Sequence, residues 1–167
     1  MDATQEALIR EMENYFGGDT KRINHARKVT AYAEQLLIHE GGSYPIVIGA
    51  AVLHDIGIHQ AEKKYGSTSG KYQEKEGPPI ARRILAELGF EQSQIDEICQ
   101  IIAHHHSPGK INTRNFRILY DADWLVNLKD EYEIHDMGKL GNIIERVFLT
   151  DSGRSLARET YLTELNQ

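Results

Sequence analysis

The chain has 167 residues, of which 40% are hydrophobic and 26% charged, the composition of an ordinary globular protein large enough for a core of its own. Its formal net charge of −6 argues against a nucleic-acid backbone as partner, because proteins that bind one usually carry a basic surface. With one cysteine, no signal-type N-terminal segment and no apolar run long enough to span a bilayer, the sequence predicts one domain over residues 1–167, in the cytoplasm and away from membranes.

Two amphipathic helices are expected at the start of the chain, over about residues 3–16 and 20–39. Arg22 falls near the middle of the apolar face of the second helix, and His25 lies beside it. One interpretation is structural: the Arg22 stem covers apolar surface while its head reaches water or pairs with a carboxylate. The other interpretation is that Arg22 serves a functional site.

The stretch from Ile46 to Gly57, IVIGAAVLHDIG, predicts a buried helix. Its apolar residues point in every direction around a helix, and His54 and Asp55 follow them. This helix therefore carries an imidazole and a carboxylate into the core, where a carboxylate needs a partner or a cation. A His-Asp hydrogen bond that only fixes packing and a metal site are both compatible with this stretch.

The polar, glycine-bearing segment 58–73 is expected to form a long loop, or a short helix followed by a loop, close enough to the His-Asp pair to act as a lid. The next helix is predicted to begin at Gly77-Pro78-Pro79 and to end near Gly89, because proline suits the first turn of a helix.

A further helix, starting near Ser93, runs into three successive histidines. These point in three directions, so at most two can serve one site, and the structural alternative is a cationic helix end on the surface. His105 continues the buried stripe of this helix, whereas His104 is offset by roughly 100°. His106 is expected to face solvent or the following loop.

The segment FRILYDADWLVNL, residues 116–128, predicts a helix that is apolar on most sides and carries Asp121 and Asp123. These two acids differ by roughly 200° around a helix, so they cannot point at the same spot. One can be a ligand while the other caps, orients a ligand or faces solvent. Two more amphipathic segments, 140–149 and 152–165, complete an all-α bundle of about seven or eight helices, since no alternating strand pattern appears.

Ionisable groups thus recur on three apolar helices, and two imidazoles with two carboxylates can hold a divalent metal ion. The order His … His-Asp … Asp, in the motifs H-x-x-K-V, LHDIG and DADWL, resembles the HD-domain superfamily of metal-dependent phosphohydrolases over about residues 25–128. The resemblance implies an HD-domain-like helical bundle, with Asp121 beside rather than among the ligands. The implied metal ligands are His25, His54, Asp55 and Asp123.

Some members of this superfamily hold two metals through extra histidines. The segment IIAHHHSP matches part of that pattern through His104 and His105, but Gln73 or Tyr72 stands where the other extra histidine is found. The resemblance therefore implies one tightly bound divalent ion (Mn, Mg, Co, Ni or Fe) and leaves open whether a second is held loosely. His104 and His105 would be ligands of that second ion, or phosphate contacts and proton donors.

The activity implied is hydrolysis of a phosphate ester or anhydride in a nucleotide or similar small molecule. Asp55 would accept a proton from the attacking water, His104 or His105 would protonate the leaving oxygen, and Arg22 would bind phosphate oxygens. Two alternatives are a di-iron oxygenase of HD type, which the missing histidine near Gln73 argues against, and a metal-containing ligand-binding or regulatory module without turnover.

Overall fold

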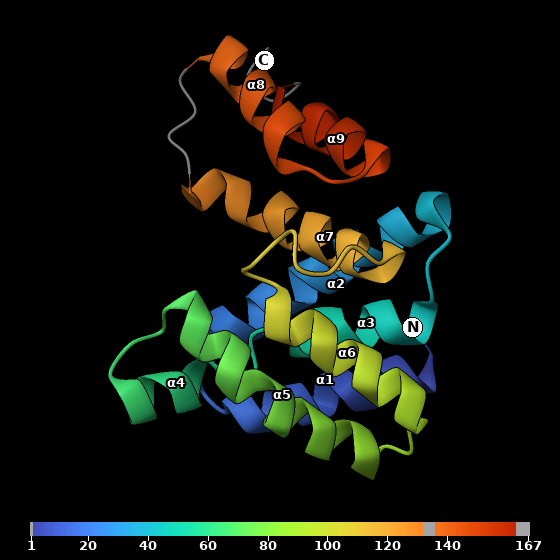
Figure 1. Cartoon of the computed structure of the whole chain (residues 1–167), viewed down its shortest axis with the longest axis vertical. Coiled ribbons are helices and arrows are strands. Elements are labelled where there is room, and N and C mark those ends of the chain that lie inside the picture. Colours follow the sequence, from blue (N-terminus) through green and yellow to red (C-terminus); the bar gives the residue numbers. More distant parts are fainter. Residues whose placement is uncertain (1, 132–135, 163–167) are drawn as a thin grey trace.

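The computed structural model describes residues 2–131 and 136–162, and this part of the chain is helical almost throughout, without a strand (Figure 1). The all-α prediction is therefore confirmed. In the described residues no helix is both long enough and apolar enough to cross a membrane. The elements are α1 (Ala3–Phe16), α2 (Thr20–Glu40), α3 (Tyr44–Leu53), α4 (Ile58–Tyr65), α5 (Gly70–Glu87), α6 (Gln92–His104), α7 (Arg114–Glu131), α8 (Met137–Val147), α9 (Asp151–Ala157) and the π-helical segment η1 (Arg158–Leu162).

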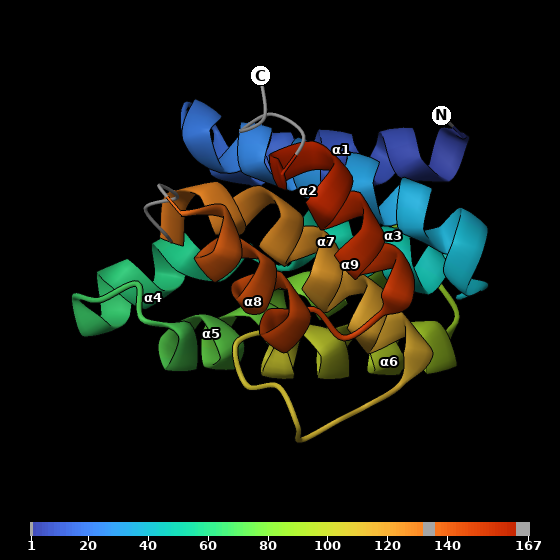
Figure 2. The same cartoon turned by 90° about the horizontal axis from the view of Figure 1, so that it is seen from above.

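Helix α3 lies at the centre of the bundle. Every residue from Val47 to Leu53 is buried, as expected for a helix that is apolar on all sides. Helices α1 and α2 lie on one side of α3, α5 and α6 lie on the other, and α7 also packs against it (Figure 2). Because α3 ends at Leu53, His54 and Asp55 begin a turn that stays inside the core.

The segment between α3 and α6 departs from the prediction. Residues 58–73 form α4, a short turn and the first turn of α5, so the short-helix alternative describes them better than a long loop. Helix α5 begins at Gly70, and the predicted start at Gly77 is wrong. Pro78 and Pro79 lie inside α5, where each removes a backbone N–H donor. Packing of α5 along α6 and against α4 holds the helix in spite of that cost.

Gly57, in the turn that follows α3, lies directly against α5. A Cβ atom on Gly57 would lie 2.5 Å from the backbone N of Gly77 and 2.9 Å from the carbonyl O of Gln73. Any side chain at this position would force the two backbones apart. The close approach therefore fixes the turn that carries Asp55 against α5, and it brings Gln73 next to that turn.

Of the C-terminal helices, α9 packs against α7 and α2, and α8 and η1 pack against α9 (Figure 1). The predicted segment 140–149 corresponds to α8, and the predicted segment 152–165 corresponds to α9 and η1. Residues 163–165 of that prediction lie outside the described residues. Leu140 and Ile144 are the buried residues of α8, so the amphipathic pattern faces the bundle as the sequence indicates.

Candidate metal centre

Two histidines and two carboxylates from distant parts of the chain meet beside the turn that follows α3. Nε2 of His25, on α2, lies 3.2 Å from Nε2 of His54. Nε2 of His25 also lies 3.3 Å from Oδ2 of Asp55 and 3.1 Å from Oδ1 of Asp123, which comes from α7. Nε2 of His54 lies 3.4 Å and 3.3 Å from the same two oxygens. The structure thus brings together all four residues that the sequence proposed as metal ligands.

The donor chemistry of this cluster fits a metal ion. Nδ1 of His54 lies 2.8 Å from the carbonyl O of Ala51, a contact that requires the proton on Nδ1. Nε2 of neutral His54 therefore presents a lone pair to the carboxylates. Lone pairs and carboxylate charges that face one point repel one another unless a proton or a cation lies between them. His25, His54 and Asp55 form a group whose ligand atoms lie close enough to hold an ion.

The pKa values of these groups follow from their mutual charges. Burial opposes protonation of His54, but Asp55 and Asp123 outweigh it and raise the pKa of His54 well above its ordinary value. Burial acts in the other direction on Asp55, yet His54 and His105 lower the pKa of Asp55 well below its ordinary value. The pKa of Asp123 is likewise lowered, by His54 and His25 against the effect of burial. The cluster therefore favours positive charge at its centre.

Asp121 faces away from this cluster. Its Oδ1 accepts the backbone N–H of Leu149 at 2.9 Å, and its Oδ2 accepts the backbone N–H of Thr150 at 2.8 Å and the Thr150 hydroxyl at 2.6 Å. Burial outweighs these hydrogen bonds and raises the pKa of Asp121 to about 6. Of the two acids in DADWL it is Asp123 that lies beside His25, and Asn127 donates to Asp123 Oδ1 at 3.0 Å.

A cavity of about 440 Å³ opens on the cluster, with Asp55 and Asp123 in its wall. Three cations of α2 also line it: Lys21, Arg22 and Lys28. Arg22, predicted to bind substrate, therefore shares a cavity with the candidate metal ligands. The sequence reasoning missed the two lysines, although they stand four residues before and three residues after His25 and so lie on the same helix face.

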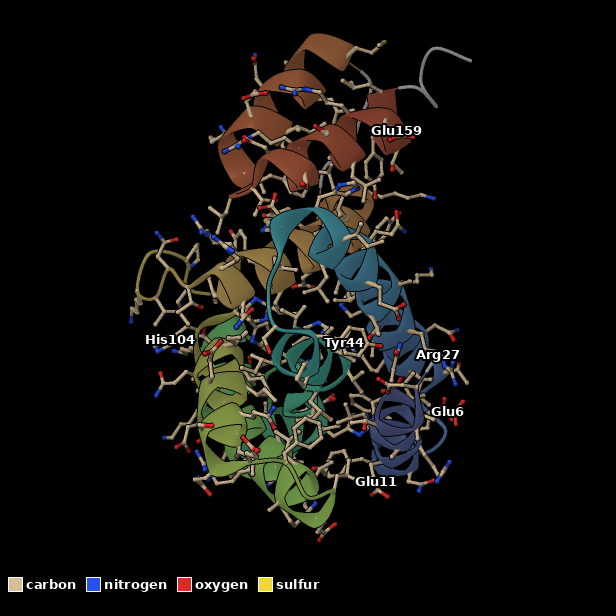
Figure 3. The ribbon with its side chains drawn as sticks, turned by 90° about the vertical axis from the view of Figure 1, so that its right-hand side faces the viewer. Glu6, Glu11, Arg27, Tyr44, His104 and Glu159 are labelled. Atoms are coloured by element: carbon tan, nitrogen blue, oxygen red, sulfur yellow. The ribbon has the colours of Figure 1, made fainter. Side chains whose placement is uncertain are left out.

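The histidine triplet is placed only partly as expected. His105 is buried, and its Nε2 lies 3.4 Å from Oδ1 of Asp55. His104, predicted to be catalytic, lies on the outer side of α6, and neither the cavity nor the groups of possible metal ligands in the described residues include it (Figure 3). His106 is exposed, as expected, and it also lines the cavity, which the sequence did not predict. The α-helix ends at His104, so helical spacing does not hold for His106.

His105 and His106 create a second group of donors beside Asp55. Nδ1 of His105 lies 2.6 Å from the carbonyl O of Ile102, so the proton is on Nδ1. Nε2 of His105 is buried and has no hydrogen-bond partner among the described residues. Ligand atoms of Asp55, His105 and His106 lie close enough to hold an ion. Desolvation of its ring and then the charge of His105 lower the pKa of His106 to about 4.

Gln73 lies where the second group would need another histidine. Its Nε2 donates to the carbonyl O of Thr68 at 2.6 Å, which leaves its Oε1 to accept from Nε2 of His106 at 3.0 Å. Tyr72, the other residue considered at this place, stacks on Tyr65 instead. Gln73 therefore positions His106 and offers the site an amide in place of an imidazole.

The comparisons with known proteins agree with this geometry. The family model for the HD domain matches residues 22–128, and the chain belongs to the HD-domain family, part of a superfamily of metal-dependent hydrolases. The fold is similar to the crystal structure of a protein described as a predicted HD superfamily hydrolase from an uncultured Thermotogales bacterium. The TM-score is 0.71 at 25% sequence identity, over 95% of this chain and 86% of that one. No curated protein matches the chain.

Proposed function

We propose that this protein hydrolyses a phosphate ester or anhydride of a nucleotide or a similar small molecule, with the help of a divalent metal ion. The observation that carries the proposal is the pairing of charges in one cavity. Asp55 and Asp123 line one part of its wall, and Lys21, Arg22 and Lys28 line another. A phosphorylated substrate is an anion that the cations of α2 can bind while its reacting phosphorus lies at the metal cluster.

His25, His54, Asp55 and Asp123 would hold the ion, and the bound ion would polarise the phosphoryl oxygens and lower the pKa of a water. Asn127 orients Asp123 through its hydrogen bond to Oδ1. The Arg22 guanidinium can bind two phosphate oxygens at once.

Proton movement is assigned to Asp55 and His105. Oδ1 of Asp55 would accept the proton of the attacking water and pass it to Nε2 of His105, 3.4 Å away. As the water oxygen bonds to phosphorus and the bond from phosphorus to the leaving oxygen breaks, His105 would protonate that oxygen. His104 has no part in this proposal because of its position on the outer side of α6. Location in the cytoplasm and a nucleotide as substrate stay predictions.

The test is metal analysis followed by a phosphate-release screen. The purified full chain is analysed for bound metal, stripped, reloaded with Mn²⁺, Mg²⁺, Co²⁺, Ni²⁺ or Fe²⁺, and assayed on a panel of nucleotides and sugar phosphates. We expect metal-dependent release of phosphate. Oxygen uptake by an iron-loaded protein that releases no phosphate would instead favour the oxygenase, and metal binding without any turnover would favour the regulatory module.

Arg22→Ala provides a sharper form of this test. Loss of a guanidinium that binds phosphate oxygens should raise KM about tenfold or more while the metal content stays that of the wild type. Arg10→Ala, which removes an exposed arginine of α1 that does not line the cavity, is the matched control. An unchanged KM in Arg22→Ala would remove this residue from the substrate site.

A further inference from the structure

A second, smaller cavity also opens beside the candidate metal centre. It has a volume of about 240 Å³, against about 440 Å³ for the cavity lined by the α2 cations. The two cavities share His106, Asp123 and Asn127 as lining residues, so they meet at the metal cluster. The smaller one is called the side chamber here, and its lining residues come from the turn after α6 and from α7.

The side chamber differs in chemistry from the larger cavity. None of its lining residues in the described part of the chain is a lysine or an arginine, so nothing there is built to hold a second phosphate. Tyr120 and Trp124 give it two half-buried aromatic side chains one helical turn apart on α7. His106 and Asn127 add polar edges beside those rings. Aromatic faces with a few polar groups at the edge suit a flat ring with hydrogen-bonding edges.

The size of the side chamber indicates that it takes part of a ligand. Pockets that hold a whole drug-sized ligand measure roughly 300–1,000 Å³. The side chamber, at about 240 Å³, is smaller than this range, while it joins a larger cavity that has the charges for a phosphoryl group. A substrate that fills both would have its phosphoryl group among the cations and its leaving group against Tyr120 and Trp124.

We propose that the side chamber binds a flat aromatic ring in the leaving group of the substrate, and that Tyr120 and Trp124 determine this preference. The proposal rests on the phosphohydrolase function above and narrows its substrate class to phosphate esters whose leaving group carries an aryl or heteroaryl ring. Tyr120 and Trp124 act by contact with that ring and not on the reacting phosphorus.

The experiment uses two phosphonates that cannot be hydrolysed, benzylphosphonate with a ring and propylphosphonate without one. Trp124 is the single tryptophan of the chain, so tryptophan fluorescence of the full-length, metal-loaded protein reports directly on this chamber. We expect benzylphosphonate to change the fluorescence saturably and to bind about fivefold or more tightly than propylphosphonate, as stacking on an aromatic side chain provides.

Variants separate ring contact from general damage. Tyr120→Leu should bind benzylphosphonate only as tightly as propylphosphonate. Its affinity for propylphosphonate should equal that of the wild type. Tyr15→Leu, on α1 and outside both cavities, is the matched control and should keep the preference. Equal affinities for the two probes in the wild type would overturn the proposal, as would a ring preference that survives both in Tyr120→Leu, measured by fluorescence, and in Trp124→Leu, measured by titration calorimetry because that variant has no tryptophan.

The two proposals fail in different ways. If phosphate esters with and without a ring in the leaving group are hydrolysed with the same kcat/KM, the proposal for the side chamber is overturned and the phosphohydrolase proposal is not. A ring preference that depends on Tyr120, in a protein that hydrolyses neither phosphate esters nor phosphate anhydrides, would support the chamber as an aromatic site and overturn the phosphohydrolase.

Discussion

Oδ1 of Asp55 lies 3.4 Å from Nε2 of His105, while Oδ2 of the same carboxylate faces His25 and His54. Asp55 therefore belongs to both groups of possible metal ligands at once. Its position depends on the turn after α3, which is buried and packed against α5 through Gly57. Asp55 is the residue whose loss should disturb the site most.

Asp55→Ala is expected to abolish metal retention and turnover together, because it removes a charge from both groups of donors. Metal content after gel filtration and phosphate release measure the two effects. Asp96→Ala is the control, since Asp96 is an exposed carboxylate on α6 paired with Arg82. Metal content at the wild-type level in Asp55→Ala would show that the ligand set is wrong.

The two acids of DADWL should respond differently to the same change. Asp123→Asn should lose metal, whereas Asp121→Asn should keep it. An asparagine at position 121 would turn an NH₂ group toward donors that now bind a carboxylate, so unfolding should require about 1–3 kcal/mol less. Urea unfolding and metal analysis of both variants test this. The reverse pattern would place Asp121 in the metal site.

The histidine triplet offers a graded test. His105→Ala should keep about one metal per chain and lose most activity, because the ligand set on the other side of Asp55 remains. His106→Ala should also lose activity, since its ring lines the cavity. His104→Ala is the control and should change little. Full activity of His105→Ala on a phosphate ester would refute the assigned proton path.

Gln73→His should raise the metal content from about one to about two ions per chain, because an imidazole would join Asp55, His105 and His106. Gln73→Leu is the matched comparison, because it removes the hydrogen bond to His106 without adding a ligand. Its metal content should stay at about one ion per chain. If Gln73→His binds no additional metal, the amide of Gln73 is not what prevents Asp55, His105 and His106 from holding a second ion.

Cys99 should be slow to react with alkylating reagents in the folded protein. The thiol is buried, it donates a weak hydrogen bond to the carbonyl O of Pro78, and burial raises its pKa above 9.0. The rate should therefore rise as the pH increases past 9, and it should rise sharply in urea at any pH. The unfolded chain loses the thiol proton first, so this group lowers the free energy of unfolding as the pH rises above 9.0.

The reactivity of Cys99 is tested by measuring its alkylation by iodoacetamide with and without urea at one pH. Cys99→Ala should remove both the labelling and this part of the alkaline loss of stability. Equally fast labelling in the folded and the unfolded protein would mean that the segment around Cys99 opens readily.

Sequence reasoning worked where the signal was local. A run that is apolar on every side, followed by His54 and Asp55, predicted a buried helix with polar groups at its end, and α3 has that form. Helical geometry also separated Asp121 from Asp123, because both lie well inside α7. These predictions depend only on the periodicity of one helix.

Predictions that depended on where a helix ends, or on a neighbouring helix, were less successful. Extending the spacing of α6 past its end put His106 in solvent, where it is exposed, but this spacing did not predict that the turn also brings His106 to the cavity; His104 was proposed from the family resemblance and not from the spacing. The start of α5 was misplaced because a proline pair suggests a helix start, while packing against α6 carries α5 through both prolines. No local pattern predicts that Gln73 would bind His106 across two helices.

The hydrogen bonds of Asp121 have a consequence for where this molecule could be cut. The HD match ends at residue 128, yet the donors that satisfy Asp121 belong to Leu149 and Thr150, beyond that limit. A fragment that stopped at 128 would lose the donors that hold Asp121 in place, two residues from Asp123. We therefore propose that the C-terminal helices and the matched region fold as one unit, so that the smallest active fragment extends past the recognisable motif.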